Sequence, residues 1–127
     1  MKIFNYATQS IDKKDIQAVI KTLKSKYLTK GNVTLNFEKK IKDFCKSKYV
    51  CATINASASL LMACKSLGIS KNDYVWTSNI TYIASINCAM HLGAKIKLID
   101  IDTTNNICIH SLKKELVSAK KKNKLPD

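Results

Sequence analysis

A repeated order of short segments constrains the fold more than any other feature of this sequence. An apolar run at Tyr49–Ile54 is followed by a turn of small polar residues, an amphipathic helix and Gly68. The order repeats with the apolar run Tyr74–Thr77, a polar loop, a helix over Tyr82–Leu92 and Gly93. Strand, turn, helix and glycine in this order are typical of βαβ units, which build a parallel sheet. The sequence therefore predicts an α/β fold.

Further periodic segments flank these two units. A third apolar run, Ile96–Ile101, predicts the next strand, and a helix is expected over Ser111–Lys120. Before the first unit, apolar residues at helical spacing predict helices over Asp12–Lys24, with Asp12 as N-cap, and over Thr34–Cys45.

Ligands of parallel sheets bind at the carboxyl ends of the strands, so the loops Asn55–Ser59 and Ser78–Tyr82 are the candidate site. The first loop opens a helix, whose free N–H groups and dipole favour a phosphate, and Ser57 could add a hydroxyl donor. The alternative is that Ser57 or Asn55 caps the helix. Tyr82 could stack on a flat ring or could be an ordinary core or rim aromatic residue.

Composition narrows the classes of function. The net charge of +13 invites a nucleic-acid interpretation, but all 22 basic residues are lysines, scattered apart from a block at 120–124. None is arginine, the preferred residue for bidentate contacts with phosphates and bases. We expect no nucleic-acid partner. With neither a membrane-length apolar run nor a signal-peptide core, we expect no membrane association and a cytoplasmic location. The five cysteines have no Cys-x-x-Cys spacing and the two histidines no ligand cluster, so we expect free thiols and no metal.

Three segments, in this order and spacing, are similar to the PLP-dependent nucleotide-sugar aminotransferases of the DegT/DnrJ/StrS type. The first is Leu28-Thr29-Lys30-Gly31 with the later Phe37-Glu38 pair, and the second is Asn55-Ala56-Ser57-Ala58. The third runs from Gly68 through Asp73-Tyr74-Val75 and Thr81-Tyr82-Ile83-Ala84 to Ile99-Asp100-Ile101-Asp102. Nearly the whole chain takes part in the match.

The resemblance implies the N-terminal portion of a fold type I large domain, incomplete in residues 1–127, with an N-terminal arm and helices over 1–47 and the cofactor-phosphate region over 48–127. It implies that Ser57 and the Ala58 backbone hold the phosphate of pyridoxal 5'-phosphate (PLP) and that Tyr82 stacks on its ring. Thr29, Lys30 and Gly31 would lie near the sugar, in a family whose sites form in a homodimer.

The implied activity is transfer of an amino group from an amino acid, usually glutamate, to a keto nucleotide sugar, with a lean toward pseudaminic-acid or lipid A precursors. The family's catalytic lysine and its aspartate partner for the ring nitrogen lie beyond residue 127. We therefore expect no catalytic residue in this chain and no activity from it alone. The alternatives are a truncated product or one half of a split enzyme with a separate C-terminal half. The sequence does not distinguish an aminotransferase from the dehydratase members of the family.

The resemblance also bears on strand pairing. In this fold the strand before the phosphate turn is not the neighbour of the next two strands. We therefore expect Tyr49–Ile54 to have no sheet partner here, and Tyr74–Thr77 to pair with Ile96–Ile101.

Overall fold

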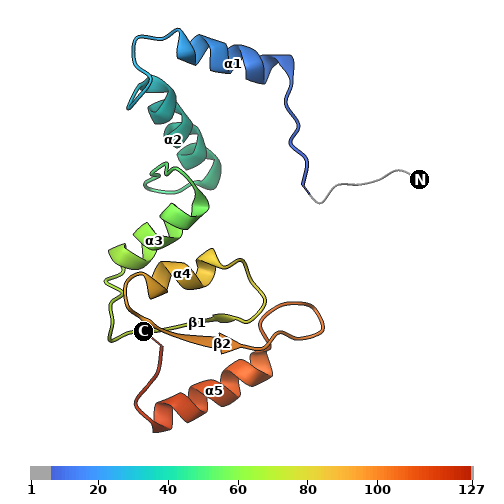
Figure 1. Cartoon of the computed structure of the whole chain (residues 1–127), viewed down its shortest axis with the longest axis vertical. Coiled ribbons are helices and arrows are strands. Elements are labelled where there is room, and N and C mark those ends of the chain that lie inside the picture. Colours follow the sequence, from blue (N-terminus) through green and yellow to red (C-terminus); the bar gives the residue numbers. More distant parts are fainter. Residues whose placement is uncertain (1–6, 127) are drawn as a thin grey trace, which may run out of the picture. The chain divides into compact units, whose positions relative to one another are not determined.

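The computed structural model describes residues 7–126, which form two compact units, residues up to 52 and residues from 53 onward. Figure 1 shows the elements of each unit along the chain. The first unit holds two helices, and the second holds three helices and two strands. No helix of the described residues is long and apolar enough to cross a membrane.

The first unit is helical. Helix α1 (Lys13–Leu23) begins at Asp12, whose carboxylate accepts hydrogen bonds from the N–H groups of Lys14 and Asp15. The Asp15 carboxylate in turn accepts from the Asp12 N–H at 2.9 Å, which completes a capping box. Helix α2 (Asn32–Cys45) follows and ends at Lys46, which has the left-handed conformation (φ 53°). The two predicted N-terminal helices and the Asp12 cap are confirmed.

The second unit is a three-layer α/β arrangement. Its elements, in chain order, are α3 (Ala56–Ser66), β1 (Tyr74–Ser78), α4 (Ala84–Met90), β2 (Lys95–Ile99) and α5 (Ile109–Lys121). The two strands pair in parallel, with Val75 opposite Ile96. Helix α4 covers one face of the strands and α5 the other (Figure 1). The predicted α/β class and the parallel pairing are confirmed.

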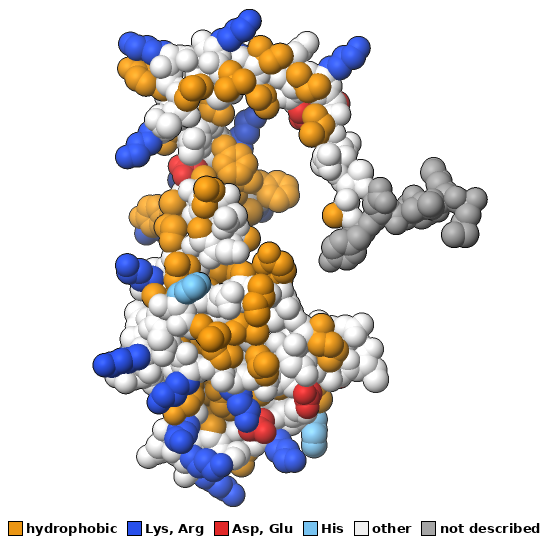
Figure 2. All heavy atoms as spheres, viewed as in Figure 1, with side chains coloured by type: hydrophobic (Ala, Val, Ile, Leu, Met, Phe, Trp, Pro, Cys, Tyr) orange, Lys and Arg blue, Asp and Glu red, His pale blue; other side chains and the backbone are white. Residues whose placement is uncertain are grey.

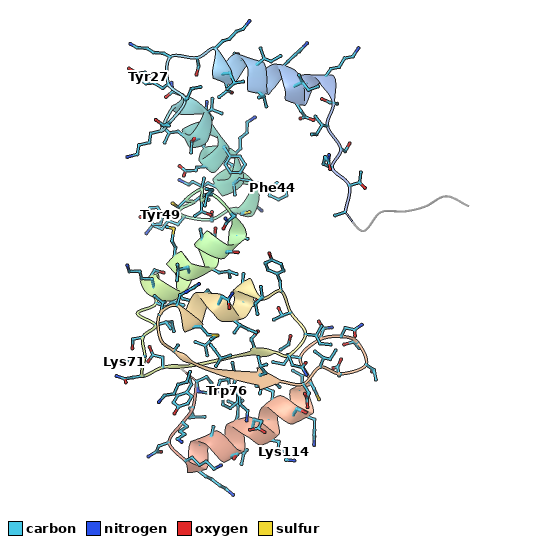
Figure 3. The ribbon with its side chains drawn as sticks, viewed as in Figure 1. Tyr27, Phe44, Tyr49, Lys71, Trp76 and Lys114 are labelled. Atoms are coloured by element: carbon cyan, nitrogen blue, oxygen red, sulfur yellow. The ribbon has the colours of Figure 1, made fainter. Side chains whose placement is uncertain are left out.

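Small side chains form the core of this unit. The buried hydrophobic residues in the described part of the chain are Ala84, Cys88, Ala89, Ala94, Ile99 and Ala119. Val75 and Ile96 pack from the strands against the cluster of Cys88, Ala89 and Ala94. Because residues in a strand alternate between faces, Trp76 lies on the opposite face, toward α5 (Figure 3). There Lys97 Nζ pairs with Glu115 of α5 at 2.8 Å. Alanine at the contacts lets helix α4 approach the sheet closely.

Two glycines end the helices on this side of the sheet, as predicted. Gly68 follows α3 and Gly93 follows α4, and each has φ +82°, a conformation that residues with a Cβ rarely adopt. A Cβ on Gly93 would lie 3.1 Å from Lys71 Cβ, whereas one on Gly68 would meet nothing within 4 Å. Of the two, only Gly93 is therefore also required by a close approach.

The prediction of a strand at residues 49–54 is wrong, because none of these residues belongs to a strand of the described structure. The reason is physical. A strand needs a neighbour for its N–H and C=O groups, and the sheet consists of β1 and β2, with each strand the other's neighbour. The expectation that this apolar run lacks a sheet partner is thus confirmed. Helix α4 also begins later than predicted, at Ala84, which leaves Tyr82 in the preceding loop.

Candidate functional site

A pocket of about 240 Å³ in the second unit brings together three residues of the predicted site. Ser57 and Ala58 reach it from the first turn of α3, and Tyr82 reaches it from the loop before α4. The remaining lining residues are Leu61, Ile83, Ala84, Asn87, Cys88 and His91. Two predicted loops, far apart in the sequence, therefore contribute to one cavity.

Asn55, and not Ser57, caps helix α3. The Asn55 side chain accepts a hydrogen bond from the Ala58 N–H at 2.8 Å. The Asn55 carbonyl accepts from the Ser59 N–H at 3.2 Å. Of the two capping residues that the alternative named, Asn55 is therefore the one that caps the helix, and the role of Ser57 in holding a phosphate stays a prediction.

Ser57 keeps its donors available. Among the described residues, neither its hydroxyl nor its backbone N–H has a hydrogen-bond partner. Ser57 is exposed at the first turn of an 11-residue helix, where the N–H groups carry the positive end of the dipole. The Ala58 N–H, by contrast, already donates to Asn55, so an anion could reach it only by sharing or replacing that bond.

Ser59 shows how a neighbouring serine differs. Its hydroxyl is hydrogen-bonded to the Thr53 hydroxyl and lies 3.4 Å from the Asn55 carbonyl oxygen. Thr53 also donates to that carbonyl at 2.9 Å. Ser59 therefore supports the turn, while Ser57, two residues earlier, is free to meet a ligand.

Tyr82 is held by an anchored loop at the carboxyl ends of the strands. The Asn79 N–H donates to the Ile99 carbonyl at the end of β2, and the Asn79 side-chain amide donates to Asp100 Oδ1, both at 2.9 Å. The Thr81 hydroxyl donates to the Ser85 hydroxyl at 3.2 Å, where α4 starts. The Tyr82 side chain itself is 76 % exposed. A ring with a free face on an anchored loop is suited to stacking.

Six lining residues were not predicted, and four of them belong to α4 or its C-terminal cap. Ala84, Asn87, Cys88 and His91 face the pocket from α4 and its C-terminal end. They are spaced three, four and seven residues from Ala84, which is one face of a helix. That spacing was visible in the sequence and could have identified them once Tyr82 was placed at the site.

The pocket has no formal charge in its lining apart from what His91 can carry. Its described lining residues include neither lysine nor a carboxylate. An anion in it would be held by helix N–H groups and a hydroxyl, as in other phosphate sites at helix starts. No group of three or more His, Cys, Asp or Glu side chains in the described part of the chain could hold a metal ion.

The predicted sugar-loop residues lie in the first unit. Lys30 has the left-handed conformation (φ 52°), and Gly31 is the N-cap of α2. A Cβ on Gly31 would lie 3.0 Å from the Tyr27 carbonyl oxygen, so the turn is tight at this point. Thr29, Lys30 and Gly31 are not among the residues that line the pocket. Their contact with a sugar stays a prediction.

Comparison of the amino-acid sequence with known proteins identifies relatives of this chain. A family model described as the DegT/DnrJ/EryC1/StrS aminotransferase family matches residues 9–123. A UDP-4-amino-4,6-dideoxy-N-acetyl-beta-L-altrosamine transaminase of Campylobacter jejuni is 36 % identical over 115 residues, which is 91 % of this chain and 30 % of that protein. The spore coat polysaccharide biosynthesis protein SpsC of Bacillus subtilis is 36 % identical over 110 residues, 87 % of this chain and 28 % of SpsC.

Two solved structures have a fold similar to that of this chain. PseC of Helicobacter pylori, an aminotransferase involved in the biosynthesis of pseudoaminic acid, is 29 % identical, with a TM-score of 0.81 over 89 % of this chain and 31 % of that one. Spr1654 of Streptococcus pneumoniae, 24 % identical with a TM-score of 0.82, shares the fold over 87 % of this chain and 29 % of its own, and its structures include a PLP form. The chain thus spans just under a third of the length of these relatives.

Proposed function

Because this chain belongs to the DegT/DnrJ/EryC1/StrS aminotransferase family, we propose that its pocket is the phosphate end of a PLP site. The observation that carries the proposal is the Ser57 hydroxyl and N–H, both without a protein partner in the described structure, beside the exposed ring of Tyr82. When bound, PLP supplies the electron sink that amino-group transfer needs.

The residues present fit part of this cofactor. A phosphate at the start of α3 would receive the Ser57 hydroxyl, the Ser57 N–H and the favourable end of the helix dipole. Tyr82 would hold the ring by stacking. The volume of about 240 Å³ lies below the roughly 300–1,000 Å³ of complete small-molecule pockets, so the pocket would enclose a portion of the ligand. Ala58 would contribute mainly its small side chain, since its N–H is engaged by Asn55.

We further propose that the whole protein transfers an amino group from an amino acid, glutamate by preference, to a keto nucleotide sugar. The proposal rests on relatives that are named as transaminases of amino-dideoxy sugars and of UDP-linked arabinose. Amino sugars of the altrosamine type are the substrates to test first. In this proposal Thr29, Lys30 and Gly31 contact the sugar, and the protein acts as a homodimer.

Cofactor binding is best tested with pyridoxamine phosphate. This form lacks the aldehyde, so it does not react with the 22 lysines, which would otherwise bind PLP at the surface. Ser57→Ala removes a hydrogen bond to a charged group, worth about 1.5–3 kcal/mol, or roughly 10- to 150-fold in affinity. Tyr82→Ala should also weaken binding, and Tyr82→Phe should not.

Ser59→Ala is the matched control, because it deletes a hydroxyl from the same helix turn that is already bonded within the protein. It should leave the affinity for pyridoxamine phosphate unchanged. Equal affinities for the wild-type protein and the Ser57→Ala variant would contradict the cofactor site. Amino transfer to a UDP-linked keto sugar, followed by mass spectrometry, tests the activity separately.

A further inference from the structure

Two cysteines meet between α3 and α4. The Cys64 thiol of α3 donates to Cys88 Sγ of α4 at 3.6 Å, which is van der Waals contact between the sulfur atoms. The Cys88 thiol donates to the Ser85 carbonyl, also at 3.6 Å. Both cysteines belong to the packed region of the second unit, where Cys88 is only 6 % exposed.

A disulfide is within reach of this geometry. The sulfur atoms must approach from 3.6 Å to about 2.05 Å, which side-chain rotation can achieve when the Cβ atoms are suitably placed. Five free cysteines are present, and this is the one pair that a hydrogen bond joins in the described residues.

The two thiols differ in access. Cys88 is one of the residues that line the pocket described above, so a small reagent in the pocket would lie against this residue. Cys64 does not line that pocket, and its thiol points at Cys88. Burial, followed by the neighbouring Cys88 thiol, raises the pKa of Cys64, which keeps it protonated near neutral pH. Cys88 is therefore placed to react first and Cys64 to react second.

We propose that Cys64 and Cys88 form an oxidation-sensitive pair, which a small hydroperoxide entering the pocket converts to an intramolecular disulfide. Cys88 sulfur attacks the peroxide oxygen, so the O–O bond breaks, an alcohol or water leaves and Cys88 becomes a sulfenic acid. Cys64 sulfur then attacks the Cys88 sulfur. The S–S bond forms, the S–O bond breaks, and the hydroxyl leaves as water with the Cys64 proton. The two thiols together lose two electrons, and these electrons reduce one peroxide.

The product would join α3 to α4 behind the pocket. α3 carries Ser57 at its start, and Tyr82 directly precedes α4. The bond would close a loop between residues 24 positions apart and tie together the two helices that shape the pocket. A thiol reductant reverses it by disulfide exchange.

The experiment maps the bond directly. Cleavage after lysine leaves Cys51 and Cys64 in one peptide, residues 49–65, and Cys88 in residues 72–95. The Cys51→Ser variant is therefore treated with hydrogen peroxide, alkylated, digested and analysed by mass spectrometry. We expect a cross-linked pair of these two peptides, a loss of about 2 Da from the intact chain, and reversal by dithiothreitol.

Two further variants of the Cys51→Ser protein complete the test. Cys64→Ser should give no cross-link, and Cys88 should accumulate as sulfenic acid that dimedone traps. Cys108→Ser, the matched control, should cross-link as before. The proposal is overturned if the peptide pair is absent from the oxidised Cys51→Ser protein while its circular dichroism is native, or if Cys88 pairs mainly with Cys45 or Cys108. It does not depend on PLP, so failure of pyridoxamine phosphate binding leaves it standing.

Discussion

At the scale of single residues, two roles at the start of α3, helix capping and ligand binding, could not be assigned from sequence alone. Asn55 caps the helix, and neither the hydroxyl nor the backbone N–H of Ser57 has a hydrogen-bond partner in the described structure. Asn55→Ala should lower the free energy of unfolding by about 1 kcal/mol, because one N–H of the first turn loses its acceptor. Ser57→Ala should leave the stability within roughly 0.5 kcal/mol of the wild type. Urea unfolding of the two variants measures both, and equal losses would return Ser57 to a capping role.

Cys108 offers a second test at this scale. The Ser111 side chain, followed by the Ser111 backbone N–H, lowers the pKa of the Cys108 thiol at the start of α5, whereas burial raises the pKa of Cys64. The thiolate is the reactive form, so a lower pKa preserves reactivity to lower pH. We expect iodoacetamide to modify Cys108 faster than Cys64 at neutral pH.

Ser111→Ala should shift the pH profile of Cys108 upward, because it removes the largest influence that lowers the thiol pKa. Mass spectrometry of peptides alkylated across a pH series reads both thiols at once. The Cys64 profile should not move, since Ser111 is not among the groups that act on it. A Cys108 profile that is the same with and without Ser111 would show that another group sets its pKa.

At the scale of elements, the two helix-ending glycines form a natural comparison. Gly68→Ala meets only the conformational cost of a Cβ at φ +82°, about 1–2 kcal/mol. Gly93→Ala has the same φ and also brings a Cβ to 3.1 Å from Lys71 Cβ. We expect it to cost about 1–3 kcal/mol more, the usual range for an overpacked contact. Denaturant midpoints of the two variants test this, and equal midpoints would mean that Lys71 moves aside freely.

Sequence patterns predicted the helices and β1–β2 because each has its own period, cap or terminal glycine. The Asp12 cap and both glycines are local signals of this kind. Residues 49–54 show where local signals fail, since an apolar run does not reveal whether a neighbouring strand exists. The pocket shows a similar limit. The two loops were found from strand order, but the Ala58 N–H was assigned to a ligand although Asn55 already accepts from it.

At the scale of the whole molecule, burial is uneven. The described residues of α1 and α2 include none that is buried, although both helices are amphipathic, and large apolar side chains such as Phe44 are 86 % exposed. Figure 2 shows hydrophobic side chains at the surface among scattered lysines. Exposed apolar faces of this extent favour association.

Hydrogen exchange of the 127-residue chain tests this unevenness. Isolated helices of 11 and 14 residues are marginal in water, so the amides of α1 and α2 should exchange fastest. Those of β1, β2 and α4 should exchange most slowly, because they surround the buried cluster. We also expect the apparent mass in gel filtration to rise with concentration. Uniform protection in a monomer of constant mass would show that α1 and α2 are stable without a covering surface.

The buried alanines have a consequence for the gene. Of the six buried hydrophobic residues in the described part of the chain, four are alanine, namely Ala84, Ala89, Ala94 and Ala119. A single base change in an alanine codon produces glycine, serine, threonine, proline, valine, aspartate or glutamate, and of these only glycine is smaller. Apart from silent third-base changes, nearly every point mutation at these codons therefore inserts volume or charge where helix and sheet already touch. At these positions a single methyl group sets the spacing between the helix and sheet backbones. This spacing limits which substitutions the codons can accept while the protein still folds.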